Sequence, residues 1–169
     1  DFPRAPDRTR PEVVVVHRPG AVQAEIRVGH LLMGGDVEGW EDLVVANQIL
    51  GGGPPGRLQQ VLRGALGYTY DARSAVTRQR RLGGFRIATA ARTEVVGATV
   101  QGIFEQVDRL RTRAIPGSEL SDEVAFLVGS FPRSVETRQQ VAGQLTEWRL
   151  IGAPADALES YRARIAAVD

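Results

Sequence analysis

The stretch that decides the fold of this chain is Gly51-Gly52-Gly53-Pro54-Pro55-Gly56-Arg57-Leu58-Gln59-Gln60-Val61-Leu62-Arg63-Gly64-Ala65-Leu66-Gly67-Tyr68-Thr69-Tyr70. Three consecutive glycines followed by two prolines disfavour both a helix interior and a central strand, so we expect a helix to end here. Apolar residues at helical spacing then predict a short helix over residues 57–66. Gly67 separates that helix from a strand that begins with two tyrosines. The stretch therefore predicts two helices followed by a strand.

The residues before this stretch predict two strands and a helix. Residues 12–18 contain four consecutive valines, which predicts a strand buried on both faces. Pro19-Gly20 is a turn signal, and residues 21–32 alternate between apolar and polar, which predicts a second strand with one polar face. A helix follows, for which Asp36 is a suitable N-cap. We expect residues 1–11, with three prolines, to form an N-terminal arm or linker.

The residues after this stretch predict two more strands and then four helices. The strands cover residues 68–77 and 82–91. The predicted helices are one that opens at residues 93–94, one capped by Ser118 and ended or kinked by Pro132, one over residues 135–150, and one from Pro154 onward. Because strands and helices come in blocks, we predict an α+β two-layer sandwich. Its sheet is mixed and mostly antiparallel, with helices on one face, and residues 12–169 form a single domain.

Composition excludes several classes of function. The formal net charge of +1 gives no bulk electrostatic case for binding nucleic acid or an acidic membrane, and no apolar run reaches membrane-spanning length. Without cysteine, disulfides and thiolate metal sites are excluded; the compartment stays open, with the cytoplasm favoured over the periplasm. Arginine without lysine is typical of a GC-rich bacterial genome. The chain begins at Asp1 without Met, so we expect a fragment or a processed chain.

The residues that commonly carry chemistry do not complete a catalytic site. His17 and His30 are isolated at the ends of the first two predicted strands, whereas catalytic zinc needs three convergent ligands. The glycine stretch lacks the Lys-Ser/Thr of a phosphate-binding loop and follows a helix rather than a strand, so it is interpreted as a structural turn. Neither histidine has an evident serine and acid companion for a nucleophilic triad. We expect no metal or other cofactor in this chain.

Two groups of basic residues remain. Residues 78–81, Arg-Gln-Arg-Arg, contain no aromatic, so a solvated hairpin tip is expected rather than a nucleic-acid or partner patch. Arg63 lies near the end of the short helix and Tyr70 at the start of the next strand, so the intervening turn could bring both to one rim of the sheet. The hydrogen-bond donors of Arg and Tyr suit peptide carbonyls or a carboxylate. The alternative for this pair is a surface ion pair and a packing aromatic.

Ordered motifs from about residue 12 to the end resemble the pitrilysin/insulinase-type zinc metallopeptidases, the inverzincins, and within them the second-half, inactive domain. The matching pieces are residues 15–24, 47–52, 56–58, 62–70, 84–85, 119–120, 129–132, 136–137 and 161–168. The family's zinc motif, His-x-x-Glu-His, is absent from this sequence. The sequence also departs from the family pattern at Pro54-Pro55, where an aromatic often replaces Pro54, and at Gly56, where Ser or Thr usually precedes the arginine.

The resemblance implies a fold like that of mitochondrial processing peptidase domains and a non-catalytic role. It implies that Arg63 and Tyr70 hold the backbone of a peptide substrate near a zinc ion that another domain or subunit carries. Gly52, Gly53, Arg57 and Tyr68 would be further loop contacts. The partners it implies are the domain with the zinc motif and an unfolded peptide, in a pseudo-symmetric pairing of such domains. The isolated domain could also form a homodimer.

Other functions stay open at this point. The chain could be a structural or assembly module derived from the same family, as in respiratory core subunits without peptidase activity. An autonomous hydrolase is disfavoured because the zinc motif is absent. Whether the chain is part of an active zinc metalloendopeptidase is left uncertain by the sequence, and we do not expect it to be active alone.

Overall fold

The computed structural model describes residues 10–35, 37–53 and 56–169 and contains a sheet of three antiparallel strands. The strands are β1 (Gln23–Met33), β2 (Thr69–Arg78) and β3 (Leu82–Arg92), in the order β1-β3-β2. Ile26 and Ala72 both lie opposite Thr89 of the central strand, so these three side chains share one face of the sheet. Outer edges of β1 and β2 carry no further strand among the described residues.

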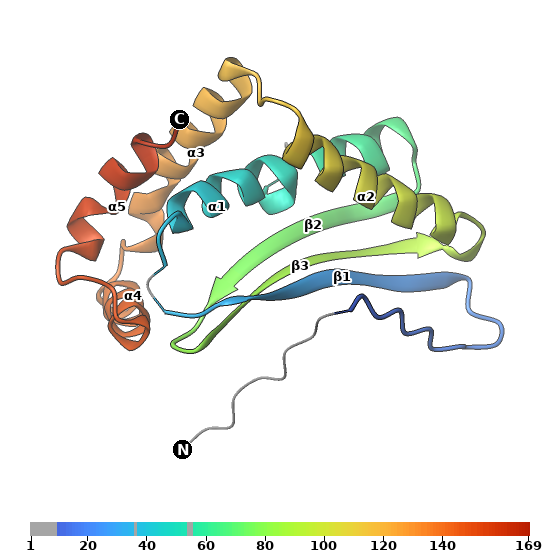
Figure 1. Ribbon diagram of the computed structural model, residues 1–169, viewed down its shortest axis with the longest axis horizontal. Coiled ribbons are helices and arrows are strands. Elements are labelled where there is room, and N and C mark those ends of the chain that lie inside the picture. Colours follow the sequence, from blue (N-terminus) through green and yellow to red (C-terminus); the bar gives the residue numbers. More distant parts are fainter. Residues whose placement is uncertain (1–9, 36, 54–55) are drawn as a thin grey trace.

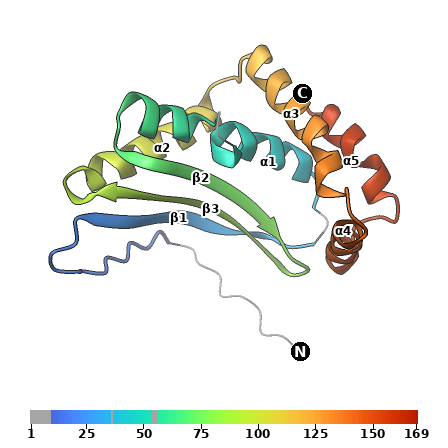
Figure 2. The same ribbon diagram turned by 180° about the vertical axis from the view of Figure 1, so that it is seen from behind.

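Helical segments cover one face of this sheet and one of its ends (Figures 1 and 2). They are α1 (Trp40–Asn47), the wide helical turns η1 (Gln48–Gly52) and η2 (Gln59–Ala65), the short η3 (Thr93–Val95), α2 (Val96–Thr112), α3 (Gly117–Ser134), α4 (Arg138–Ile151) and α5 (Ala157–Ala166). In both views α1 and α2 lie over the same face, whereas α3, α4 and α5 gather beyond the end of β2. The predicted α+β two-layer class is therefore confirmed, with the sheet fully antiparallel.

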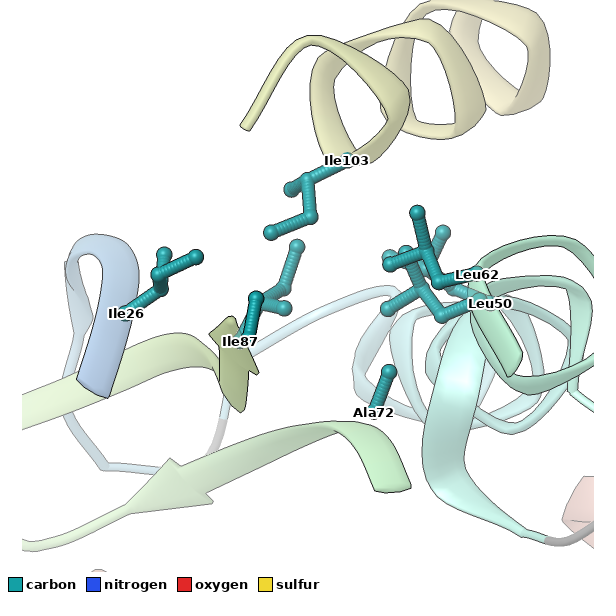
Figure 3. Packing of buried hydrophobic residues seen from close by; sticks show 8 residues of the cluster. Ile26, Leu50, Leu62, Ala72, Ile87 and Ile103 are labelled. Carbon is teal, nitrogen blue, oxygen red and sulfur yellow. The ribbon is translucent and has the colours of Figure 1, made fainter. Parts of the chain in front are cut away.

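The main core lies between this sheet face and the helices that cover it. Figure 3 shows Ile26, Ile87 and Ala72 from the strands facing Leu50, Leu62 and Ile103 from η1, η2 and α2. The alternation of β1 explains this arrangement, because Ile26 is buried while its neighbours Glu25 and Arg27 are exposed on the opposite face. The apolar stripe of α2 packs on the same cluster, as its periodicity predicts.

Residues 12–18 correct the first sequence prediction. They form no strand in the structure, and Val13–Val16 are between 73% and 87% exposed rather than buried on both faces. The predicted turn is present, since the Ala21 N–H donates to the Arg18 carbonyl at 3.2 Å. Valine favours a pleated surface with neighbours on both sides, and among the described residues this segment is not paired with the sheet. The strand propensity of the four valines was therefore not sufficient for residues 12–18 to form a strand.

The glycine stretch ends the preceding helix, as predicted. The backbone leaves helical geometry at Gly51 (φ −175°, ψ 20°), η1 ends at Gly52, and Gly53 is extended. A Cβ on Gly51 would lie 2.9 Å from the backbone nitrogen of Ser74, so glycine allows η1 to approach β2 directly. The Ser74 hydroxyl donates to the carbonyl of Asn47, the last residue of α1, at 3.2 Å and so ties β2 to the chain directly before η1. The predicted N-cap Asp36, the Pro54-Pro55 pair and most of the predicted arm lie outside the described residues.

Two further boundaries in the helical half are decided differently from the sequence prediction. Ser118 does not cap α3, which begins at Gly117 after Pro116, and Pro132 lies within the last turn of α3. The next helix starts at a capping box that the sequence analysis missed, in which the Gln140 N–H donates to the Thr137 hydroxyl and the Thr137 N–H to the Gln140 side chain. In the described residues, no helix combines the length and hydrophobicity needed to cross a membrane.

Candidate functional site

Arg63 and Tyr70 lie together at the rim of the sheet. Arg63 is in the last turn of η2 and Tyr70 is near the start of β2. The guanidinium carbon of Arg63 lies 5.0 Å from the centre of the Tyr70 ring, within the range of a cation–π contact. Tyr70 is 83% exposed, so its hydroxyl and one ring face are available to a ligand. This arrangement is neither the surface ion pair nor the packed aromatic of the alternative interpretation.

A tight turn between η2 and β2 brings these two residues together. Gly67 has a φ of +62°, a conformation that residues with a side chain rarely adopt. The Gly67 N–H donates to the Arg63 carbonyl at 3.2 Å, and the Tyr68 N–H donates to the Leu62 carbonyl at 2.8 Å. The end of the helix is thereby fixed to the first residues of the strand.

Tyr70 lies at a bulge in β2. The register between β2 and β3 shifts between Thr69 and Ala72. Two side chains pair with backbone groups at this shift: the Ala72 N–H donates to Oε1 of the half-buried Gln59 at 2.9 Å, and the hydroxyl of the buried Thr89 donates to the Asp71 carbonyl at 2.7 Å. Gln59 and Thr89 could not be identified from the sequence, because a register shift leaves no signal in the pattern of residue types.

A shallow hollow of about 570 Å³ lies beside the pair, on the sheet face that the helices leave uncovered. Tyr68, Tyr70 and Ala88 line it together with polar residues of β1 and β3. Two of the residues expected at the site, Tyr68 and Tyr70, thus lie at the hollow itself, and Arg63 lies next to it through its contact with Tyr70.

The other expected loop contacts lie elsewhere. Arg57 is engaged by Glu119 of α3, with Nε to Oε1 at 2.8 Å and Nη2 to Oε2 at 2.6 Å. The hydrogen bond from Arg57 lowers the pKa of Glu119, and the same hydrogen bond raises the pKa of Arg57. Gly52 sits against the side chains of Asn47 and Gln48, away from the hollow. Gly53 directly follows η1 in an extended conformation, and whether either glycine meets a ligand stays a prediction.

The two histidines and Arg78, the first residue of the basic run 78–81, lie in three different parts of the structure. His17 is in the exposed segment 12–18, and the ring of His30 lies 5.5 Å from that of Phe85. Within the part of the chain that the structure describes, no three His, Asp or Glu side chains are grouped to share a metal ion. Arg78 is not part of a solvated tip, as had been expected: it ends β2, is buried, and lies 4.6 Å over the ring of Trp40. Its place on the core face follows from alternation with Ser74 and Val76.

Comparisons with known proteins agree with this architecture. The profile of the peptidase M16 inactive domain matches residues 1–127. The chain belongs to the peptidase M16 inactive-domain family. The resemblance to the inactive domain of pitrilysin-type peptidases is thereby confirmed, and the chain is a non-catalytic domain of the kind found in zinc proteases. No curated protein sequence gives a significant match.

Solved structures show the same M16 fold. The peptidase M16 inactive domain from Pseudomonas fluorescens superposes with a TM-score of 0.81 at 25% identity, over 88% of this chain and 36% of that one. A protease from Helicobacter pylori gives a TM-score of 0.83 at 18% identity, over 92% of this chain and 38% of that one. The inactive peptidase domain of a candidate zinc protease from Bordetella parapertussis superposes with a TM-score of 0.73 at 15% identity, over 92% of this chain and 84% of that one. This M16 domain therefore spans little more than a third of the length of the first two proteins.

Proposed function

We propose that this M16 domain positions an extended peptide substrate for a zinc site carried by another domain or subunit. The observation that supports the proposal most directly is the Arg63–Tyr70 contact, which presents an exposed ring and a cation beside the hollow on the uncovered sheet face. Family membership supplies the setting, since the inactive domain occurs in zinc proteases.

The chemistry of the pair suits this role. The guanidinium of Arg63 carries several N–H donors in a fixed plane, and the Tyr70 hydroxyl adds one more. Both can donate to a peptide carbonyl, and these bonds strengthen when negative charge develops on that oxygen. The contact with the Tyr70 ring favours a position of the guanidinium beside that ring before the peptide arrives. A zinc ion in the partner would supply a bound water of lowered pKa as the nucleophile.

The test is reconstitution with the domain that carries His-x-x-Glu-His. We expect Arg63→Ala and Tyr70→Phe each to lower kcat/KM for an oligopeptide by about tenfold or more, because each removes one donor to the reacting carbonyl. Arg162→Ala on α5, which also removes an exposed arginine, is the matched control. Unchanged turnover in both site variants would favour the alternative, a structural or assembly module without a peptidase role.

We also propose that the isolated chain self-associates through residues 12–18. Four consecutive valines, between 73% and 87% exposed, hold apolar side chains in water. An antiparallel pair centred on Val15 places Val14 of one copy opposite Val16 of the other and removes these apolar side chains from water.

A further inference from the structure

The sheet face that the helices leave uncovered carries a distinct set of side chains. In Figures 1 and 2, α1 and α2 lie on the other side of the sheet, and the described chain places no helix on this side. The pairing of the strands arranges these side chains in rows across the sheet. In one row, Arg27 of β1 and Arg73 of β2 both lie opposite Ala88 of β3. In an adjacent row, Arg86 lies between Gly29 and Ala75.

Small side chains at the centre of this face form a depression in the surface of the sheet. Ala88 and Ala90 of β3 form part of the hollow of about 570 Å³, and Gly29 and Ala75 continue the run of small residues beside Arg86. An extended chain can lie along such a floor, with the longer side chains of the outer strands on either side of it.

The charges on this face are not balanced. Glu25 pairs with Arg27 at 2.8 Å, and Asp71 pairs with Arg73 at 2.9 Å. Arg86 and Arg92 are exposed, and within the described part of the chain neither has a carboxylate partner. The face thus holds four arginines against two carboxylates, while the whole chain has a formal net charge of only +1.

We propose that this face selects extended peptides that carry acidic side chains. Alternate residues of an extended peptide point the same way and are about 7 Å apart, which equals the spacing between neighbouring rows of the sheet. Carboxylates at that spacing can reach Arg86 together with Arg27 or Arg73 of the neighbouring row. A carboxylate farther along the peptide can reach Arg92 at the end of β3. The proposal rests on the peptide-positioning function and specifies its substrate class.

A nucleic acid is the other anionic ligand to consider, and the structure favours a peptide. Glu25 and Asp71 lie on the same face and would repel a continuous run of phosphates. A peptide carries its charges singly, so its acidic residues can meet the unpaired arginines while neutral residues pass the two carboxylates. The hollow also adjoins Tyr70 and Arg63, whose donors suit a peptide carbonyl.

The experiment measures binding of labelled extended peptides to the chain of 169 residues by fluorescence anisotropy. Three peptides of about eleven residues, the length of a strand here, differ only in carrying Glu, Gln or Lys at alternate positions. At low salt we expect the Glu peptide to bind about tenfold more tightly than the Gln peptide, and the Lys peptide most weakly. Raising the salt to about 0.5 M should remove most of this difference, because exposed charges are then screened.

Variants assign the effect to this face. Arg86→Gln and Arg92→Gln should each weaken binding of the Glu peptide about threefold and leave the Gln peptide unchanged. Arg162→Gln on α5 removes the same charge on a different part of the molecule and should change neither affinity. Circular dichroism confirms that each variant is folded.

Each other outcome contradicts the proposal in a distinct way. Equal affinity for the Glu and Gln peptides would overturn the acidic preference while leaving the positioning function intact. Absence of binding by all three peptides would overturn both. Tighter binding of a single-stranded oligonucleotide than of the Glu peptide would assign the face to nucleic acid. The positioning function is tested separately, because the Arg63 and Tyr70 variants are assayed on the turnover of an oligopeptide rather than on peptide binding.

Discussion

Arg57 and Glu119 are joined by two parallel hydrogen bonds of 2.8 and 2.6 Å, which connect the residues after the glycine stretch to the first turn of α3. The side chain of Arg57 is only 14% exposed and that of Glu119 is 31% exposed. This two-point geometry is among the stronger forms of ion pair in proteins. It holds η2, and with it Arg63, in place relative to the helical end of the domain.

The first prediction concerns the contribution of this ion pair to stability. Glu119→Gln should lower the free energy of unfolding by about 1–3 kcal/mol, because it leaves the largely buried Arg57 cation without its counter-charge. Urea denaturation followed by circular dichroism measures the change. The control is Asp108→Asn, which breaks the exposed Arg111 pair on α2 and should cost less than about 0.5 kcal/mol. Equal effects of the two substitutions would contradict the prediction.

The second prediction concerns the pH dependence of the same pair. Arg57 holds the pKa of Glu119 in the folded state below its ordinary value of 4.5. The stabilisation is therefore fully present above about pH 4.5 and is lost as the pH falls through the folded-state pKa. The difference in unfolding free energy between the wild type and Glu119→Gln should be constant near neutrality and shrink in acid. If the difference in unfolding free energy grew on acidification, the predicted direction of the Glu119 pKa shift would be wrong.

The third prediction is that the bulge positions Tyr70. Thr89→Val keeps the shape of the side chain but leaves the Asp71 carbonyl without its donor, so we expect a loss of about 1–2 kcal/mol of stability. The ring protons of Tyr70 should also shift in NMR spectra toward their values in Arg63→Ala, because the ring leaves the guanidinium. Thr146→Val, which removes an exposed hydroxyl on α4, should produce neither effect. Unchanged Tyr70 signals in Thr89→Val would exclude the proposed positioning by the bulge.

The fourth prediction concerns self-association through residues 12–18. Val15→Lys would place two lysines opposite each other at the centre of the proposed antiparallel pair. Sedimentation velocity should therefore detect dimers of the wild type at concentrations where Val15→Lys is monomeric. Leu150→Lys, which makes the same change at another exposed apolar residue, should remain dimeric. A monomeric wild type would refute this interface.

Periodicity alone predicted much of the fold. Alternation in residues 21–32 and the apolar stripe after residue 93 placed β1 and α2 with the correct faces buried, because a half-buried strand or helix repeats its apolar positions at its own period. Periodicity failed for residues 12–18, where four valines give no alternation to distinguish the faces. It also missed the start of α4, where the capping box of Thr137 and Gln140 was overlooked.

The sequence by itself determined the class of the domain, its family and the order of Arg63, Gly67 and Tyr70 along the chain. Only the tertiary structure decided that the guanidinium lies over the ring, because Arg63 and Tyr70 belong to different elements whose placement follows from the turn at Gly67 and the register of β2. It likewise decided that Arg86 and Arg92 face outward without carboxylate partners among the described residues. Local patterns record which face of an element is apolar, whereas the pairing of elements distant in sequence sets which polar groups meet and which are left for a ligand.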